Sequence, residues 1–422
     1  MVCSGVTEAD AEAVRRRLVV MHPLLPSRKL DIRVKATAII LLAMLIGGGL
    51  WISWPLTSRA QGPGMSSGEV PMTTPWRPRD RNAKYSGPEA CVKCHQEESH
   101  QHATAMGRAL EPVATSEILR AHPRLTFRTG PYSYEVVRRG DQTFYTVTDG
   151  KDTISEPILY SFGQGKAGQT YIFRHNGTFY ESHLSFYRDV GALDFTIGYP
   201  RDVPSSLDEA AGRAISIDEA RHCFACHGTG AAYGNQLELD RLIPGVTCEA
   251  CHGPGVDHIA AMQAKKFQNE RIFNPGGMGA DELAQEFCGS CHRSAEQVSS
   301  NKLLRGLISV RFQPYRIFTS RSHDPDDKRM ACTACHNPHE NPVQDMAFYD
   351  AKCFACHRSS QSLKSAATAK AETKEGRTSK PCPVAQRLCV SCHMPKVEFP
   401  GSHFKFTDHR IRIAKAGEPF PN

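Results

Sequence analysis

The sequence predicts an α+β protein, mostly helix and loop, with one β-rich insert and one N-terminal transmembrane helix. Three observations lead to this expectation. A Cys-x-x-Cys-His motif recurs seven times between residues 91 and 393. The long segment between the first two copies has the alternation and the turn residues of β-hairpins. An uncharged run of 23 residues, 36–58, follows a basic N-terminus.

The seven motifs use fourteen of the sixteen cysteines. A single Cys-x-x-Cys pair is ambiguous, because it also occurs in zinc sites and redox dithiols. Neither use needs a histidine directly after every pair. Covalent haem does, because two thiols attach to the porphyrin and the histidine ligates its iron. We therefore expect seven covalent haems c, with the helices and loops wrapped around them. Motifs 1 to 7 are, in chain order, Cys91/Cys94/His95, Cys223/Cys226/His227, Cys248/Cys251/His252, Cys288/Cys291/His292, Cys332/Cys335/His336, Cys353/Cys356/His357 and Cys389/Cys392/His393.

The β-rich insert is expected at residues 124–200, between motifs 1 and 2. A Gly-Asp pair at 140–141 and an Asn-Gly pair at 176–177 each stand between two β-rich runs, which is typical of hairpin turns. The segment 163–168 has the G-x-G-x-x-G spacing of a dinucleotide fingerprint. A strand rather than a helix follows it, so we interpret it as a loop between strands. Beyond the insert the pattern becomes helical, beginning with a capping-box pattern at 216–219.

Residues 36–58 are expected to form an uncleaved transmembrane helix between a cytoplasmic tail, 1–35, and a linker, 59–84. The run is long enough to span a bilayer, and seven basic residues shortly before it place that end in the cytoplasm. The alternative is a cleaved signal peptide, since small residues at 58–60 fit a cleavage site. In both cases the multihaem domain, 85–422, lies outside the cytoplasm, in the periplasm or an equivalent space.

The formal net charge of +7 could suggest a nucleic-acid partner. Part of this excess lies in the N-terminal tail, and each haem adds two propionates, so the haem-loaded domain is expected to be acidic. The sequence also lacks a basic patch interleaved with aromatic residues. We therefore expect no nucleic-acid partner. The expected partners are redox proteins or quinol-linked donors and, through the N-terminal helix, the cytoplasmic membrane.

A six-coordinate haem iron needs a second axial ligand, most often another histidine or a methionine. Eleven histidines beyond residue 60 lie outside the motifs, which is enough for seven irons. A histidine that closely follows a motif cannot easily turn back to its own iron, so it is expected to reach a neighbouring haem. The candidate distal ligands are His102, His258, His323, His339, His403 and His409.

Three segments carry a family resemblance: CEACHGPGVDH at 248–258, CTACHNPHE at 332–340, and CVSCHMPK followed by TDHRI near the C-terminus. They resemble the multihaem cytochromes related to pentahaem nitrite reductase, octahaem hydroxylamine oxidoreductase and the tetrahaem cytochrome of ammonia oxidisers, in particular uncharacterised cytochromes of that group. The resemblance covers roughly residues 85–422 and implies closely packed haem pairs. The chain departs from the nitrite reductases, which typically carry a lysine at the catalytic haem, because all seven of its motifs end in histidine.

Three functions are compatible with these patterns. The leading interpretation is a membrane-anchored electron carrier, in which the protein sets the spacing and ligation of seven haems. The alternative is an oxidoreductase that acts on a small nitrogen or sulfur compound at one haem with an open distal site. In the third, the β-rich insert docks a partner or a ligand. No catalytic residue is assigned from the sequence, and Cys382 has no assigned role.

Overall fold

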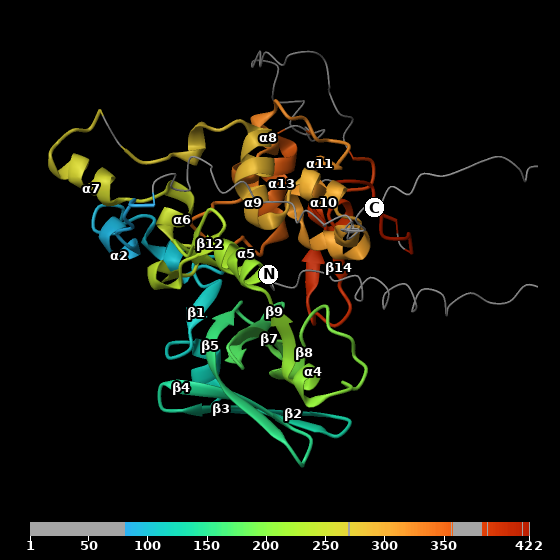
Figure 1. Ribbon diagram of the computed structural model, residues 1–422. Coiled ribbons are helices and arrows are strands. Elements are labelled where there is room, and N and C mark those ends of the chain that lie inside the picture. The colour runs from blue at the N-terminus through green and yellow to red at the C-terminus, as the bar shows by residue number, and fades with distance from the viewer. Residues whose placement is uncertain are drawn as a thin grey trace, which may run out of the picture.

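The computed structural model describes residues 81–268, 271–355, 357, 382–385, 387–415 and 417–421 (Figure 1). The expected tail 1–35, the apolar run 36–58 and most of the linker 59–84 lie outside these residues, as does Cys356 of motif 6. Within the described part of the chain, no helix is long and apolar enough to cross a membrane.

The β-rich insert folds as one antiparallel sheet of nine strands, in the lower half of Figure 1. Strands β2 to β8 neighbour one another in chain order, while β1 pairs with β5 and β9 pairs with β7. The sheet therefore recruits strands from both sides of the expected insert, 124–200. The strands are β1 (Leu110–Pro112), β2 (Arg124–Thr129), β3 (Tyr132–Arg139), β4 (Gln142–Thr148), β5 (Thr153–Phe162), β6 (Gln169–His175), β7 (Thr178–Tyr187), β8 (Ala192–Phe195) and β9 (Gly212–Ile215).

Tight turns connect neighbouring strands. Gly140 and Asp141 separate β3 from β4, and Asn176 and Gly177 separate β6 from β7. Gly140, Asn176 and Gly177 have positive φ angles of 63°, 50° and 78°, which short hairpin turns require. The segment 163–168 joins β5 to β6, so its glycines belong to a loop between strands.

The sheet curls until β2 approaches β8, and the main hydrophobic core lies inside this curl. Phe127 of β2 packs edge-on against Phe195 of β8, with ring centroids 5.4 Å apart. Alternate residues of β3 and β4 are buried, as expected for strands with one face toward a core. Nineteen buried side chains form this cluster, to which α3 (Glu117–Ala121) and α4 (Leu207–Ala211) contribute.

The outer face of the sheet carries motif 2, which ends helix α5 (Ile217–His227). The helix begins with a capping box: the Ser216 hydroxyl accepts from the backbone N–H of Glu219, and the Glu219 carboxylate accepts from that of Ser216. Phe224 of α5 lies edge-on against Phe162 of β5, with ring centroids 5.2 Å apart. The sheet therefore supports motif 2 directly.

The other motifs lie in a region of short helices and loops, in the upper half of Figure 1. Its α-helices are α2 (Pro88–Cys91), α6 (Cys248–His252), α7 (Val256–Gln263), α8 (Ala280–Glu282), α9 (Gly289–His292), α10 (Ala295–Ser300), α11 (Gln313–Phe318), α12 (Cys332–Cys335), α13 (Met346–Phe354) and α15 (Cys389–His393). A π-helix, η5 (Leu283–Cys288), leads into motif 4, and the 3₁₀ turns are η2 (Ser99–Ala103), η3 (Leu239–Arg241), η4 (Pro275–Gly277), η6 (Lys302–Leu304), η7 (Gly306–Arg311) and η8 (Lys328–Met330). Its described residues also form three two-stranded ribbons: β10 (Gly228–Thr229) with β13 (Ile243–Pro244), β11 (Ala232–Tyr233) with β12 (Gln236–Leu237), and β14 (Lys396–Glu398) with β15 (Lys405–Thr407).

Candidate haem-binding sites

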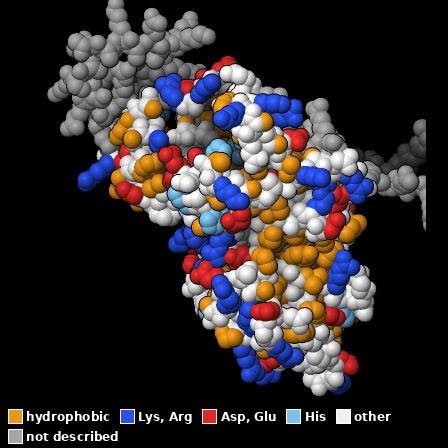
Figure 2. Space-filling model, turned by 90° about the vertical axis from the view of Figure 1, so that its left-hand side faces the viewer, with side chains coloured by type: hydrophobic (Ala, Val, Ile, Leu, Met, Phe, Trp, Pro, Cys, Tyr) orange, Lys and Arg blue, Asp and Glu red, His pale blue; other side chains and the backbone are white. Residues whose placement is uncertain are grey.

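The motif spacing brings two thiols and one imidazole together on a helical turn. Residues three and four positions apart are neighbours on a helix surface, and the first cysteine stands at these distances from the second cysteine and the histidine. In motif 3 the whole segment Cys248–His252 is helical, and so is Cys389–His393 in motif 7. Figure 2 shows histidine side chains gathered on the upper, helical part of one face. This local fold suits covalent haem attachment.

The second cysteines of motifs 1, 4 and 7 differ in how far the polypeptide covers them. Cys94 and Cys392 are exposed, and Cys291 is half-buried. Sγ of Cys291 and Sγ of Cys392 each lie 3.7 Å from the hydroxyl oxygen of the preceding serine. None of the three belongs to an apolar cluster of the described residues. These sulfurs are therefore accessible to a porphyrin, and the wrapping of helices and loops around each haem stays a prediction.

Oxygen acceptors orient four of the motif histidines. In each case Nδ1 points at an oxygen, so Nδ1 carries the proton and Nε2 remains as the metal-binding nitrogen. Such a second contact is typical of histidines that ligate metals. The acceptors are Ala109 O for His227 (3.1 Å), Phe273 O for His252 (2.9 Å), Gln313 Oε1 for His292 (3.2 Å) and Arg412 O for His393 (2.9 Å).

Three motif histidines each face a second histidine from another part of the chain. The pairs and their ring-centroid distances are His95–His258 at 6.3 Å, His252–His339 at 6.2 Å and His336–His409 at 6.2 Å. Two metal–imidazole bonds of about 2.0 Å, with half a ring behind each nitrogen, separate two centroids by about 6 Å. Each pair therefore leaves room for one iron, and the residues present fit a haem with two histidine ligands.

The histidine of motif 6, His357, has neither kind of support. Its side chain is exposed, and its ring has no oxygen acceptor and no histidine partner within the described part of the chain. Its backbone N–H donates to Cys353 O at 2.9 Å, which closes the turn of the motif. The neighbouring Cys356 lies outside the described residues. Each of the other motif histidines has an oxygen acceptor or faces a second histidine, and His357 has neither. Its role as an iron ligand therefore stays a prediction from the motif alone.

Burial favours the neutral form of several paired histidines, and the neutral imidazole is the form that binds a metal. Burial lowers the pKa of His409 to about 4, and it also lowers the pKa of His336 and of His339. Nδ1 of His409 donates to the carbonyl oxygen of Thr407 at 3.0 Å. Its Nε2 is therefore free of the proton and available to a metal.

The other three candidate distal ligands do not face a motif histidine. Nε2 of His323 lies 3.1 Å from Asp281 Oδ1, and Nε2 of His403 lies 2.6 Å from Asp194 Oδ2. His102 is exposed, and its contacts within the described residues include no ring contact with a motif histidine. Because carboxylates occupy the nitrogen that an iron would need in His323 and His403, the geometry supports only the three paired candidates.

Contacts between cysteines show which motifs are neighbours. The first cysteine of motif 3 contributes to a raised pKa of Cys91 in motif 1, and the first cysteines of motifs 4 and 5 and of motifs 6 and 7 interact in the same way. Electrostatic repulsion from Cys251 of motif 3 contributes to the raised pKa of Cys288 in motif 4, and repulsion from Cys353 of motif 6 contributes to that of Cys335 in motif 5. Cys226 Sγ of motif 2 lies 3.9 Å from Ser290 O of motif 4. The motifs thus follow the order 1-3-4-5-6-7, with motif 2 beside motif 4.

A buried carboxylate between the cysteines of motif 3 ties motifs 1 and 3 together, and no sequence signal pointed to it. Glu249 is 1% exposed and accepts hydrogen bonds from the backbone N–H groups of Ser86, Gly87 and Gly255 at 2.7 to 2.8 Å. These donors replace the water that a carboxylate loses on burial. The same contacts hold the start of α7, which carries His258, against the segment before motif 1.

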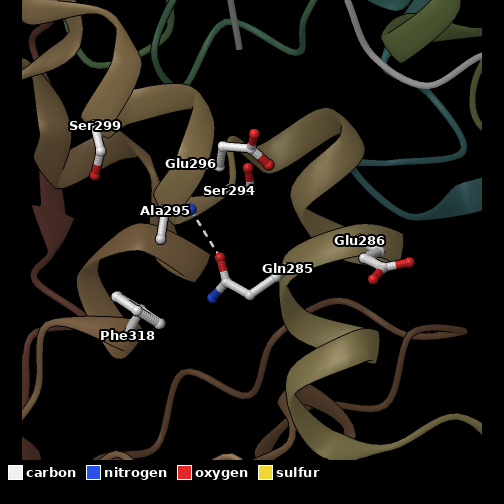
Figure 3. A pocket seen from close by; sticks show the side chains of 7 residues that line it. All are labelled: Gln285, Glu286, Ser294, Ala295, Glu296, Ser299 and Phe318. Atoms are coloured by element: carbon white, nitrogen blue, oxygen red, sulfur yellow. Dashed lines mark hydrogen bonds between the residues drawn. The ribbon is translucent and has the colours of Figure 1, made fainter. Parts of the chain in front are cut away.

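A hollow of about 420 Å³ beside motif 4 is separate from the haem sites (Figure 3). One wall is held by Gln285, whose Oε1 accepts from the backbone N–H of Ala295 at 2.7 Å and whose Nε2 donates to Pro314 O at 3.1 Å. Two acidic side chains, Glu286 and Glu296, also line it, but no motif cysteine or histidine does. We assign no haem to this hollow.

The motif turns and the histidine pairs define a c-type cytochrome with several haems. The chain matches the family Cytochrome c3 over residues 242–346 and the family Cytochrome c554 and c-prime over residues 203–253. It is 26% identical over 209 residues to the Multiheme cytochrome MtrA of Shewanella baltica (strain OS185). That match covers 46% of this chain and 52% of the relative, so the chain spans about half the length of the curated protein it matches. No solved structure matches the chain. The matches support a multihaem c-type cytochrome with covalently bound haem and a role in electron transfer.

Proposed function

We propose that the chain is a membrane-anchored electron carrier with seven haems, one at each motif. The observation that carries this proposal is the presence of three motif histidines that each face a second histidine at 6.2 to 6.3 Å. Two histidine ligands fill both axial positions of an iron and leave none for a substrate, which favours electron transfer over catalysis. When bound, each haem supplies an iron that accepts and releases one electron.

The motif cysteines hold the porphyrins, and the motif histidines ligate the irons from one side. On the other side, His258 serves motif 1, His339 serves motif 3 and His409 serves motif 5. Each of these histidines follows a motif two places further along the chain than the one it serves. Binding at one motif therefore depends on the placement of another, which supports a single rigid array of haems.

The neighbouring cysteines support a continuous path for electrons. The first cysteines of motifs 1 and 3, 4 and 5, and 6 and 7 interact in pairs, which supports close spacing of the porphyrins they hold. The order 1-3-4-5-6-7 has motif 1 at one end and motif 7 at the other. The second cysteines of both end motifs, Cys94 and Cys392, are exposed. We propose these ends as the places where electrons enter and leave, with redox proteins or a quinol-linked donor as partners.

The first test measures haem number and axial ligation. The intact mass should exceed that of the polypeptide by seven haems, and fewer than six would contradict the proposal. In ferric protein, His258→Ala should convert one low-spin haem to high spin in the EPR spectrum, because it removes the ring opposite His95. His323→Ala is the matched control: its ring contacts Asp281, so its spectrum should equal that of the wild type.

The membrane anchor is tested by fractionation. The apolar run 36–58 and the basic residues before it predict a protein that stays in the membrane through a high-salt wash, with its haems outside the cytoplasm. A soluble product that begins near Gln61 would show a cleaved signal peptide instead.

A second candidate function is an oxidoreductase that acts on a small nitrogen or sulfur compound. Among the described residues, no second histidine ring faces His227, His292 or His393, and an iron with one open axial position can bind a substrate. The same holds for His357. Nitrite, hydroxylamine or sulfite is added to the ferric protein. A stoichiometric high-spin signal that shifts with one of them supports this candidate, and its absence supports the carrier.

A further inference from the structure

Two arginines beside motifs 2 and 4 form no ion pair with any described residue. Arg311 ends η7 and is only 6% exposed. Arg293 directly follows the histidine of motif 4 and is half-buried. Neither guanidinium makes a hydrogen bond or an ion pair within the part of the chain that the structure describes. Both positive charges therefore lack the partner that a buried or half-buried arginine normally has.

The fully buried Arg316 shows how the same protein satisfies a buried guanidinium. Its Nε and Nη2 donate to the two carboxylate oxygens of Asp408 at 2.8 and 3.0 Å, and its Nη1 donates to Pro421 O at 2.8 Å. A buried charge without such partners is strongly destabilising. The burial of Arg311 therefore points to an anion that the described part of the polypeptide does not supply.

The charges around Arg311 increase this need for an anion. Burial, with repulsion from Arg293, lowers the pKa of Arg311 to about 10, so the side chain stays charged at neutral pH. Glu181 is also near, but its carboxylate already pairs with Arg213 at 3.2 Å. Arg311 stands two residues before Gln313, whose Oε1 lies 3.2 Å from Nδ1 of His292 in motif 4. Because Cys226 Sγ of motif 2 lies 3.9 Å from Ser290 O of motif 4, this part of the chain lies where motifs 2 and 4 meet.

We propose that Arg293 and Arg311 together bind a propionate carboxylate of the haem attached at motif 2. This rests on the proposed function, because it needs a haem at that motif. Each haem carries two carboxylates, and the planar guanidinium group binds a carboxylate through two parallel hydrogen bonds. The burial of Arg311 also favours an anion that is part of the folded interior over one that enters from solvent.

The charge of these arginines has a consequence for the potential of that haem. A positive charge beside a haem stabilises reduced iron relative to oxidised iron, which carries one more positive charge. Removing the charge should therefore lower the midpoint potential of one haem and leave the distant haems unchanged.

The test compares full-length, haem-loaded variants by spectroelectrochemical titration. One midpoint should fall in Arg311→Gln and fall further in the double variant Arg293→Gln/Arg311→Gln, with seven haems retained by mass. Arg311→Lys should stay close to the wild type, because it keeps the charge. The matched control is Arg124→Gln, which removes an exposed arginine that pairs with Glu135 on the sheet; its potentials should be unchanged.

Unchanged potentials in both Gln variants would overturn the proposal while leaving the haem count, and with it the proposed function, intact. A soluble anion would be indicated if phosphate or nitrite changed the EPR spectrum of the wild type but not that of Arg311→Gln, and this too would overturn it. If Arg311→Gln binds fewer haems than the wild type, the haem content of Arg311→Lys distinguishes a need for positive charge from a packing role. Full loading of the Lys variant supports the need for a positive charge, whereas incomplete loading shows a packing role and contradicts the proposal.

Discussion

The sheet and the helical region bury apolar surface in different ways. Inside the sheet, nineteen buried side chains form one cluster, in which rings such as Tyr134 and Tyr145 pack edge-on with centroids 6.3 Å apart. In the described helical region, the two apolar clusters contain only five and three buried residues. The sheet therefore has a core of its own, while the helical region is expected to obtain most of its core from the porphyrins.

This difference shows how cofactors change what a sequence has to encode. The sheet depends on alternating side chains and on turn residues, which act over a few positions. The helical region depends on covalent attachment and on a few buried polar contacts, such as those of Glu249 and of the pair Arg316–Asp408. The stability of the helical region should therefore depend on haem attachment and on its buried polar contacts, whereas the stability of the sheet should depend on its own side chains.

The largest expected effect is the loss of the helical region when no haem is attached. In a chain produced without haem attachment, we expect the sheet with α5, 110–227, to stay folded. The region from 248 to 421 should be digested completely by a protease that leaves the loaded protein intact. Limited proteolysis with mass spectrometry measures this, with the haem-loaded protein as control. Equal digestion of both regions would contradict the comparison.

A smaller effect is expected from the buried ion pair of the helical region. Asp408→Leu leaves Arg316 buried without its carboxylate, so the free energy of unfolding should fall by about 3–5 kcal/mol. Denaturant unfolding followed at the Soret band measures this. Asp327→Ala breaks a more exposed pair with Arg329 and should cost about 1 kcal/mol or less. Equal losses in the two variants would show that the porphyrins, not this pair, hold the region together.

The smallest effect belongs to the sheet and depends on pH. His183 is 3% exposed, neither ring nitrogen has a hydrogen-bond partner among the described residues, and burial lowers its pKa to about 4. As the pH falls, the unfolded chain binds the proton first, at its ordinary pKa of about 6.5. Stability that is fully present above pH 6.5 should be lost progressively down to pH 4, by about 3 kcal/mol.

Denaturant titrations at several pH values, followed by far-ultraviolet circular dichroism, measure this loss. His183→Phe keeps a ring of similar size beside Tyr134 but cannot be protonated, so its stability should change less over the same range. An identical pH dependence in the two proteins would assign the loss to other groups.

The features that depend on nearby residues could be predicted from the sequence. The turns at 140–141 and 176–177, the capping box at 216–219 and the helical turns of the motifs lie where the residues indicated. Each is decided by residues a few positions apart. The full extent of the sheet was harder to predict from the sequence, because β1 and β9 pair with strands far away in the chain.

Contacts between distant segments decide the sites, and spacing alone does not contain them. His323 and His403 stand near motifs in the sequence but fold beside Asp281 and Asp194. The expectation that His258 reaches a neighbouring haem did not specify which one. Its position opposite motif 1 follows from the fold around Glu249, for which no local pattern exists.

The burial of the individual motif residues could not be predicted from the sequence either. All seven motifs have the same spacing, yet Cys94, Cys392 and His357 are exposed, whereas Cys223 and His227 of motif 2 are buried. Motif 2 differs because its helix α5 packs on the sheet, which supplies cover that the motif itself does not encode.

The contacts between thiols of different motifs have a consequence for the order of events during biosynthesis. In the folded chain, the first cysteines of motifs 1 and 3 interact, as do those of motifs 4 and 5 and of motifs 6 and 7. A haem-free chain that folded this far would hold pairs of thiols ready to oxidise to disulfides between motifs, especially in an oxidising compartment. Attachment of a haem at each motif before that motif meets its neighbour would prevent this oxidation.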